Sequence, residues 1–190
     1  PPYGIDAAND SRFGKKFKVA ATRRKEYAKK DWDKGVPTKD YFEQLFRVSK
    51  NQIIWGINYY PYDFLTGGRL FWDKDVAEDY TNSKGEIAYK SFGHGVDLVK
   101  VTWNGMLQYD MKNKEERIHP TQKPIRLYEW ILDKYAKEGQ TILDTHLGSG
   151  SIAIACHNRG YNLTAYEIDK DYFEAAKKRL EAHQSQLTMF

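Results

Sequence analysis

The carboxyl-terminal quarter of the chain carries the pattern that most restricts its fold. An apolar strand predicted at 141–144 runs into a glycine-rich loop, a short helix at 151–158 and a stop at Gly160. A second strand at 162–166 and an amphipathic helix at 171–182 follow directly. Strand, helix and strand at this spacing form a βαβ unit, in which the two strands lie parallel. We therefore predict an α/β fold built on a largely parallel, doubly wound sheet.

The loop between the first strand and its helix has the composition of a ligand-binding turn. It reads Asp144-Thr145-His146-Leu147-Gly148-Ser149-Gly150, and Glu167 ends the second strand. The glycines let the backbone approach a ligand closely, and an acid about 20 residues further on typically binds ribose hydroxyls. Asp144 would repel a pyrophosphate but attract an ammonium group. The loop therefore favours S-adenosylmethionine over a dinucleotide, although a plain glycine turn with a solvated Glu167 stays an alternative.

Two proline-containing motifs stand elsewhere in the chain. In Pro1-Pro2-Tyr3 the prolines donate no hydrogen bond and leave carbonyls free to accept, while the tyrosine ring can stack on a base. The segment 119–124 reads His-Pro-Thr-Gln-Lys-Pro and presents Thr121 and Lys123 before an apolar helix. Alone, the first motif is also typical of a turn, and the second of a helix-entry loop.

Apolar periodicity and turn residues predict the remaining elements. They are a helix at 38–50 capped by Thr38, strands at 53–57, 69–73, 87–92 and 98–103, and a helix that begins at Pro124 and is stopped by Gly139. Residues 74–118 are polar, rich in glycine and free of helical periodicity. We expect the specificity region within this irregular stretch, at 78–116.

Charge is distributed unevenly along the chain. Residues 11–30 hold nine Lys and Arg against one Glu, a net charge of +8, so that the rest carries −4 of the overall +4. A basic segment on a mildly acidic body indicates binding to a polyanion, although such runs are also common in solvated loops. The residues expected on nucleic acid are Lys15, Lys16, Lys18, Arg23, Arg24 and Lys25.

Composition excludes several other classes of protein. A single cysteine, Cys156, rules out an internal disulfide framework and a multi-cysteine metal site, and we expect no metal. No apolar stretch approaches the roughly 20 residues of a membrane span, and no charged-then-apolar leader opens the sequence. We expect a cytoplasmic protein without membrane contact.

Taken together, the motifs resemble the amino-directed DNA methyltransferases. P-P-Y, H-P-T-Q-K-P and D-x-x-x-G-S-G occur here in the order of the β class of that family, and the stretches 31–42, 51–59 and 71–74 are similar to it too. The chain departs from the family pattern at two places. The first residue of the catalytic tetrapeptide, before Pro1, is absent, and Thr145 and His146 replace the usual Pro and Phe.

The resemblance implies one catalytic domain over 1–190, of the S-adenosylmethionine-dependent methyltransferase type with a small irregular target-recognition insertion. Its parts would be the catalytic motif at 1–3, a basic lid loop at 4–37, the recognition region at 78–116 and a cofactor-binding half at 119–190. Catalysis is assigned to Pro1, Pro2 and Tyr3. S-adenosylmethionine binding is assigned to Asp144, Thr145, Leu147, Gly148, Ser149, Gly150, Glu167, Thr121 and Lys123.

The implied reaction is site-specific methylation of an exocyclic amino group in double-stranded DNA after base flipping, as in restriction–modification systems. Adenine N6 is favoured over cytosine N4, because Gly4-Ile5 after the motif looks more like the adenine enzymes. Methylation of cytosine N4, of a protein amide or RNA base, and a DNA-binding protein without catalysis stay as alternatives. The choice between monomer and homodimer, and the recognised sequence, stay open.

Overall fold

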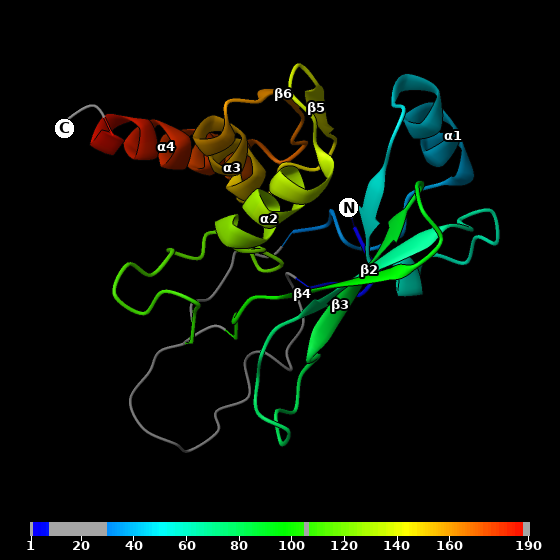
Figure 1. Cartoon of the computed structure of the whole chain (residues 1–190), viewed down its shortest axis with the longest axis horizontal. Helices are drawn as coiled ribbons and strands as arrows, with labels where there is room; N and C mark the ends of the chain where they lie inside the picture. Colours follow the sequence, from blue (N-terminus) through cyan, green and yellow to red (C-terminus); the bar gives the residue numbers. More distant parts are fainter. Residues whose placement is uncertain (1, 8–29, 105–106, 188–190) are drawn as a thin grey trace.

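The computed structural model of the chain describes residues 2–7, 30–104 and 107–187. Figure 1 shows how these residues are arranged, with elements in this order: α1 (Lys39–Val48), β1 (Ile53–Trp55), the 3-10 helix η2 (Ile57–Tyr59), β2 (Gly68–Asp73), β3 (Gly85–Lys90), β4 (Val96–Lys100), α2 (Ile125–Tyr135), β5 (Thr141–Asp144), α3 (Ser151–Arg159), β6 (Asn162–Ala165) and α4 (Lys170–Leu187). The chain is a mixed α/β protein.

The larger sheet is mixed rather than parallel. Its strand order is β1-β3-β2-β4, with β3 antiparallel to both β1 and β2, and β4 parallel to β2. The helix-free connection between β2 and β3 suits antiparallel neighbours, and β4 reaches its parallel place beside β2 after the chain has returned through β3. A largely parallel, doubly wound sheet is therefore not confirmed among the described residues.

The second sheet confirms the predicted βαβ unit. β5 and β6 pair in parallel, from Thr141 opposite Asn162 to Asp144 opposite Ala165, and α3 connects them. Gly150 and Gly160 flank α3 in the left-handed conformation, with φ of 73° and 72°. That conformation is unfavourable for residues with a side chain, so glycine is what allows the tight entry to and exit from this helix.

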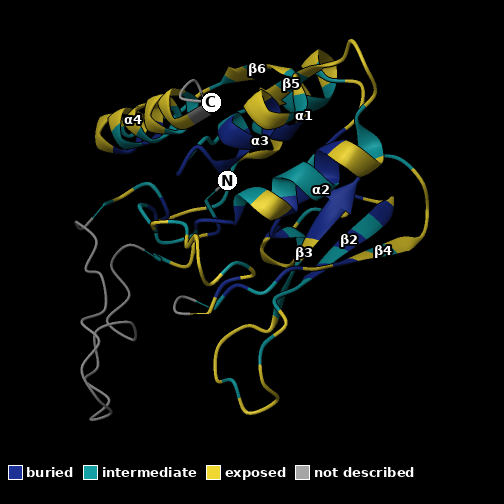
Figure 2. Cartoon of the chain, turned by 60° about the vertical axis from the view of Figure 1, so that its left-hand side comes forward, coloured by how far each residue is buried: buried dark blue, intermediate teal, exposed yellow. Residues whose placement is uncertain are grey.

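Helix α2 joins the two sheets. One of its sides contributes Leu127 and Ile131 to a core cluster with the tryptophans of β1 and β2, and another contributes Leu132 to a cluster with α3. The opposite face of the larger sheet packs on α1 through a third cluster that includes Tyr3 and Phe42. Figure 2 shows α2 between the sheets with its buried sides inward, whereas α4 and the β2–β3 connection are mostly exposed.

Several predicted boundaries differ from the structure. The strand predicted to reach residue 57 ends at Trp55, because Gly56 turns the chain into η2 with φ of 79°. Helix α2 ends at Tyr135, before Gly139, and α4 continues to Leu187. Thr38 caps α1 as predicted, and the described part of 74–118 contains no helix. None of the described helices is both long and apolar enough to cross a membrane.

Candidate active site

Tyr3 is held by its main chain. The side chain of Asp33, fully buried, accepts hydrogen bonds from the backbone N–H groups of Tyr3, Gly4 (3.0 Å) and Ala7 (2.9 Å). Hydrogen bonds to a buried carboxylate are among the stronger ones in proteins. Asp33 therefore fixes the start of the chain, a role that the sequence did not predict. Pro2 is half-buried beside it, and Pro1 lies outside the described residues.

The ring of Tyr3 is enclosed on several sides and is only 8% exposed. Tyr59 stacks on it with a centroid distance of 5.1 Å and an interplanar angle of 24°. Gly56 lies at its edge so closely that a Cβ there would come within 2.3 Å of Tyr3 Cε1. Lys123 Nζ donates to the phenolic oxygen at 3.0 Å. Among these neighbours Tyr59 is the exposed one, at 40%.

The predicted cofactor residues around the glycine loop do come together. Asp144 ends β5 and accepts from the backbone N–H of His146 at 2.9 Å. Glu167, just beyond β6, accepts from the N–H of Gly148 at 2.8 Å through one oxygen and from Asp169 at 2.9 Å through the other. Burial, and secondarily the charge of Glu167, raises the pKa of Asp144. Parallel strands thus deliver both acids to one end of the β5–β6 sheet.

The two unusual loop residues, Thr145 and His146, contact α1. Tyr41 Oη lies 2.7 Å from Thr145 Oγ1, which lies 3.0 Å from His146 Nδ1. Burial lowers the pKa of His146 to about 3, so the imidazole is neutral at pH 7. These contacts join α1 to the glycine loop, and they give His146 a packing role.

The loop that carries Thr121 and Lys123 lies between the two sites. His119 at its start packs against the rings of Trp32 and Tyr172, at centroid distances of 4.9 and 4.3 Å, and a Cβ on Gly148 would lie 3.8 Å from its ring. Thr121 Oγ1 lies 3.1 Å from His119 Nδ1. One end of this loop therefore meets the glycine loop, and the other, at Lys123, meets Tyr3.

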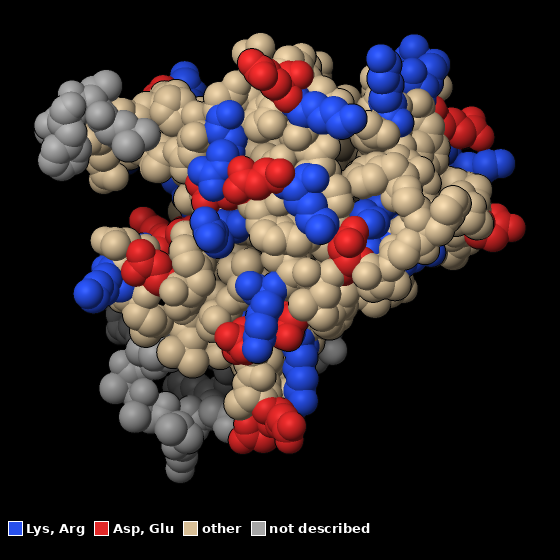
Figure 3. Space-filling model, in the orientation of Figure 1, with Lys and Arg blue, Asp and Glu red and all other residues tan. Residues whose placement is uncertain are grey.

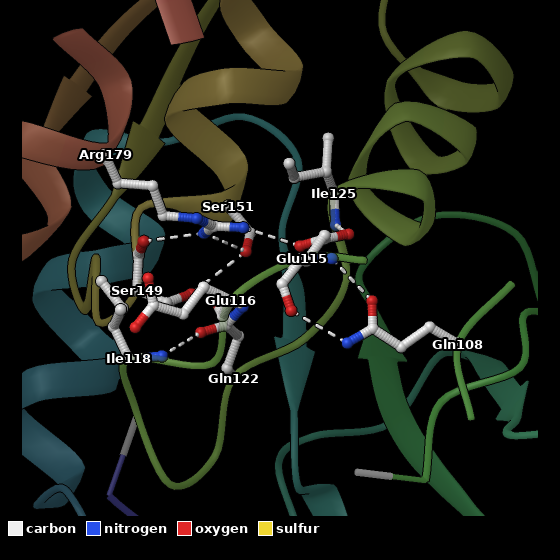
Figure 4. Close-up of polar contacts among 9 residues, drawn as sticks. All are labelled: Gln108, Glu115, Glu116, Ile118, Gln122, Ile125, Ser149, Ser151 and Arg179. Atoms are coloured by element: carbon white, nitrogen blue, oxygen red, sulfur yellow. Dashed lines mark hydrogen bonds and ion pairs between the residues drawn. The ribbon is translucent and has the colours of Figure 1, made fainter. Parts of the chain in front are cut away.

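An arginine on α4 that was not predicted from the sequence hydrogen-bonds to the glycine loop and to the start of α3. Arg179 donates to Ser149 O and Ser151 Oγ, both at 2.9 Å, and to Glu115 Oε2 at 2.6 Å. The other oxygen of Glu115 accepts from the N–H of Ile125, the first residue of α2, at 2.9 Å. Figure 4 shows this network. A lone arginine in an amphipathic helix gives no sequence signal of such a role.

Two glutamines order the end of the predicted recognition region. The Gln108 amide both donates to the carbonyl of Glu115 and accepts from its N–H, at 2.9 and 2.7 Å. The Gln122 amide likewise connects Glu116 O and Ile118 N, at 3.1 and 2.9 Å (Figure 4). The segment before α2 is therefore held to the protein body although it has no regular structure.

The basic residues expected to bind DNA, Lys15 to Lys25, lie outside the described residues. Lys30, at the end of that segment, pairs with Asp169 at 3.0 Å and Asp171 at 2.5 Å, close to Glu167. On the face drawn in Figure 3, lysines and arginines are interleaved with acidic side chains rather than gathered into one patch.

Residues 3–178 match the DNA methylase family N6_N4_Mtase. The chain belongs to this family. Within it, the chain is 39% identical over 70 residues to the type II methyltransferase M.HpaI of Haemophilus parainfluenzae, covering 37% of the chain and 22% of that protein. It is 28% identical over 158 residues to M2.DpnII of Streptococcus pneumoniae, covering 80% of the chain and 49% of that protein.

The chain thus spans less than half the length of these curated DNA methylase relatives. Among solved structures, the M1.HpyAVI–SAM complex is similar with a TM-score of 0.57 and 23% identity, over 80% of this chain and 86% of that one. At this identity the likeness concerns the fold. It agrees with the mixed α/β architecture described above.

Proposed function

We propose that this member of the DNA methylase family transfers a methyl group from S-adenosylmethionine to an exocyclic amino group in double-stranded DNA, with adenine N6 as the favoured target. One observation carries the proposal. The loop 119–124 lies next to the glycine loop, where a Cβ on Gly148 would be 3.8 Å from the His119 ring, and it contacts Tyr3 through Lys123. A donor site and a base site that flank one loop meet the need of transfer chemistry to hold the two reactants close and aligned.

The residues around the glycine loop fit S-adenosylmethionine. When bound, this cofactor supplies an electrophilic methyl group on its sulfonium. Asp144 offers a carboxylate to the amino-acid ammonium, and a cation there would lower the pKa that burial raises. Gly148 and Gly150, with φ of 55° and 73°, let the loop turn tightly, and a Cβ on Gly150 would lie 3.0 Å from Ala176 Cβ. Glu167 would accept from ribose hydroxyls. Thr145, Leu147, Ser149 and Thr121 complete the proposed site.

Residues at the start of the chain would activate the base. The lone pair of an exocyclic amine is spread into its ring, so the amine is a weak nucleophile. The Pro1 carbonyl and the side chain before it would accept the two N–H bonds, which localises the lone pair on nitrogen. Tyr3 would stack on the flipped base, a contact worth about 1–3 kcal/mol. Pro2 keeps this turn rigid.

Access to Tyr3 is through Tyr59. Because the ring of Tyr3 is 8% exposed and Tyr59 stacks on it, a base reaches the ring by displacing Tyr59 or by entering between the two rings. Tyr59 belongs to the short η2 helix and is 40% exposed, so its side chain is the one free to move. The remaining neighbours of the ring are fixed by burial or by the backbone.

Binding and selection of DNA would be divided between two segments. The basic residues Lys15, Lys16, Lys18, Arg23, Arg24 and Lys25 would contact phosphates in a sequence-independent way. The recognition region, at 78–116, would read the sequence. The Gln108 side chain bonds to both the carbonyl and the N–H of Glu115 at the end of this region, which gives an otherwise irregular segment a defined position. A type II, restriction–modification role agrees with the relatives named above.

The test is incubation of the full-length protein with labelled S-adenosylmethionine and mixed-sequence DNA, followed by mass spectrometry of the nucleosides. We expect N6-methyladenine, and Asp144→Ala and Glu167→Ala should each weaken cofactor binding by about 1–3 kcal/mol in calorimetry. N4-methylcytosine without N6-methyladenine would overturn the choice of base. Unchanged affinity in both folded variants would overturn the cofactor site.

A further inference from the structure

Lys123, which was expected to bind the cofactor, has its partners at Tyr3 and Glu86 instead. Its ammonium donates to Tyr3 Oη at 3.0 Å and pairs with Glu86 Oε2 at 2.9 Å, and the side chain is only 6% exposed. The rings of Tyr3 and Trp55 lie 5.6 and 5.3 Å from the same nitrogen. An ammonium has three protons to donate. Two of them are directed to Tyr3 and Glu86, and the flanking rings are favourable neighbours for the charge.

Glu86 on β3 keeps the Lys123 ammonium group charged. Glu86 pairs with Lys123 through one oxygen and with Lys74 through the other, each at 2.9 Å. Burial works to raise the pKa of Glu86, but the two ammonium groups outweigh it and lower that pKa to about 2. Burial also works against the charge of Lys123, yet Glu86 and Tyr3 keep its pKa above the ordinary value. Both partners therefore stay ionised at neutral pH.

Tyr3 is consequently held at both ends. Asp33 holds its backbone N–H, and Lys123 holds its phenolic oxygen on the other side of the ring. A phenyl ring fixed at its Cα end alone can still tilt about χ1 and χ2. Anchoring the phenolic oxygen as well fixes the direction of the Cβ–Oη axis, and the stacked ring of Tyr59 sets the rotation of the Tyr3 ring about that axis.

We propose that Lys123, paired with Glu86, is a positioning residue that acts through the hydroxyl of Tyr3 and fixes the ring on which the flipped base stacks. This role replaces the one expected for Lys123 as a residue that binds S-adenosylmethionine. It rests on the proposed function, because it takes Tyr3 as the base-stacking residue. The chemical consequence is a Tyr3 ring aligned before the base arrives, so the base is captured with less loss of freedom at the moment of binding.

The test is a double-mutant cycle in the full-length protein. One arm is Lys123→Met with Glu86→Gln, made in the Lys74→Gln background so that neither lysine is left as a buried charge without its carboxylate partner. The other arm is Tyr3→Phe in the same background, which keeps the ring and removes its hydroxyl. Readouts are the cofactor Kd by calorimetry, kcat, and the fluorescence of 2-aminopurine placed at the target base, which reports flipping without turnover. Lys74→Gln is the matched control, because Lys74 also pairs with Glu86 but donates to no atom of Tyr3 in the described contacts.

We expect the Lys123/Glu86 arm to reduce kcat and the flipping signal by about tenfold, the effect of losing one charged hydrogen bond. In the Tyr3→Phe background the same arm should change them by less than about twofold. Cofactor Kd should stay within about twofold throughout, as should all readouts in Lys74→Gln. A tenfold weaker cofactor Kd, or an equal loss with and without the hydroxyl, would overturn the proposal.

Thermal unfolding of each variant separates misfolding from positioning. If the Lys123/Glu86 arm unfolds, Tyr3→Phe alone still decides, since it should lower the flipping signal while Lys74→Gln does not. A Tyr3→Phe protein that flips the base as well as the unaltered protein does would overturn the proposal. Failure of the proposed function itself would be seen separately, as a folded unaltered protein that methylates no DNA.

Discussion

At the scale of single residues, Gly56 explains how the Tyr3 ring fits. Its φ of 79° suits glycine, and a Cβ there would overlap Tyr3 Cε1 at 2.3 Å. We predict that Gly56→Ala lowers the free energy of unfolding by about 1–3 kcal/mol from the backbone strain alone. Because the ring must also shift, the 2-aminopurine flipping signal should fall with it. Urea unfolding and fluorescence titration with DNA measure the two effects.

Gly35→Ala is the matched control for this prediction. A Cβ at Gly35 would meet nothing within 4 Å, so the substitution should change stability by less than about 0.5 kcal/mol. Should Gly56→Ala be as stable as Gly35→Ala and flip the base equally well, the tight enclosure of Tyr3 would be refuted.

At the scale of elements, Arg179 fastens α4 to the glycine loop and, through Glu115, to the start of α2. Both side chains are largely buried, and breaking such a pair leaves an uncompensated charge. We predict that Arg179→Met destabilises the fold by about 3–5 kcal/mol. Replacing Arg179 and Glu115 together by methionine should cost less than Arg179→Met does, as measured by urea unfolding.

The control for this prediction lies on the same helix. Lys177 pairs with Glu181 at 4.0 Å, and both side chains are well exposed. Lys177→Met should therefore change stability by no more than about 0.5 kcal/mol. If the paired methionine variant lost as much as the sum of its single variants, Arg179 and Glu115 would be acting through separate contacts rather than as one unit.

At the scale of the whole molecule, the basic segment and the recognition region should contribute separately to DNA binding. Replacing Arg23, Arg24 and Lys25 by alanine should reduce the slope of log K against log salt by up to about 3, because each phosphate contact contributes about 0.9. Site preference should survive. The measurement is a salt titration of DNA affinity on cognate and scrambled duplexes.

Substitutions within the recognition region, at 78–116, are the counterpart of those in the basic segment. They should alter the preference between duplexes while leaving the salt slope nearly unchanged, since base contacts release few counterions. An unchanged slope in the triple alanine variant would mean that these charges keep a loop solvated without contacting DNA.

The sequence determined the elements whose signals are local. Two apolar strands around a glycine loop are specified by neighbouring residues, so the β5–α3–β6 unit was predicted almost to the residue. Thr38 at the start of α1 and the helix after Pro124 were readable for the same reason. The placement of Asp144 and Glu167 at one loop followed too, because parallel strands end at the same edge.

Tertiary structure decided the contacts between residues far apart in the chain. Three contacts join segments separated by roughly 30 to 120 positions. They are the hydrogen bond of Asp33 to Tyr3, the bonds of Lys123 to Tyr3 and Glu86, and the bond of Arg179 to Ser149 in the glycine loop. The mixed larger sheet was decided in the same way, because strand order depends on which edges meet rather than on any one strand's pattern. A charged side chain looks the same in sequence whether it is solvated or buried, and only packing shows which partner neutralises it.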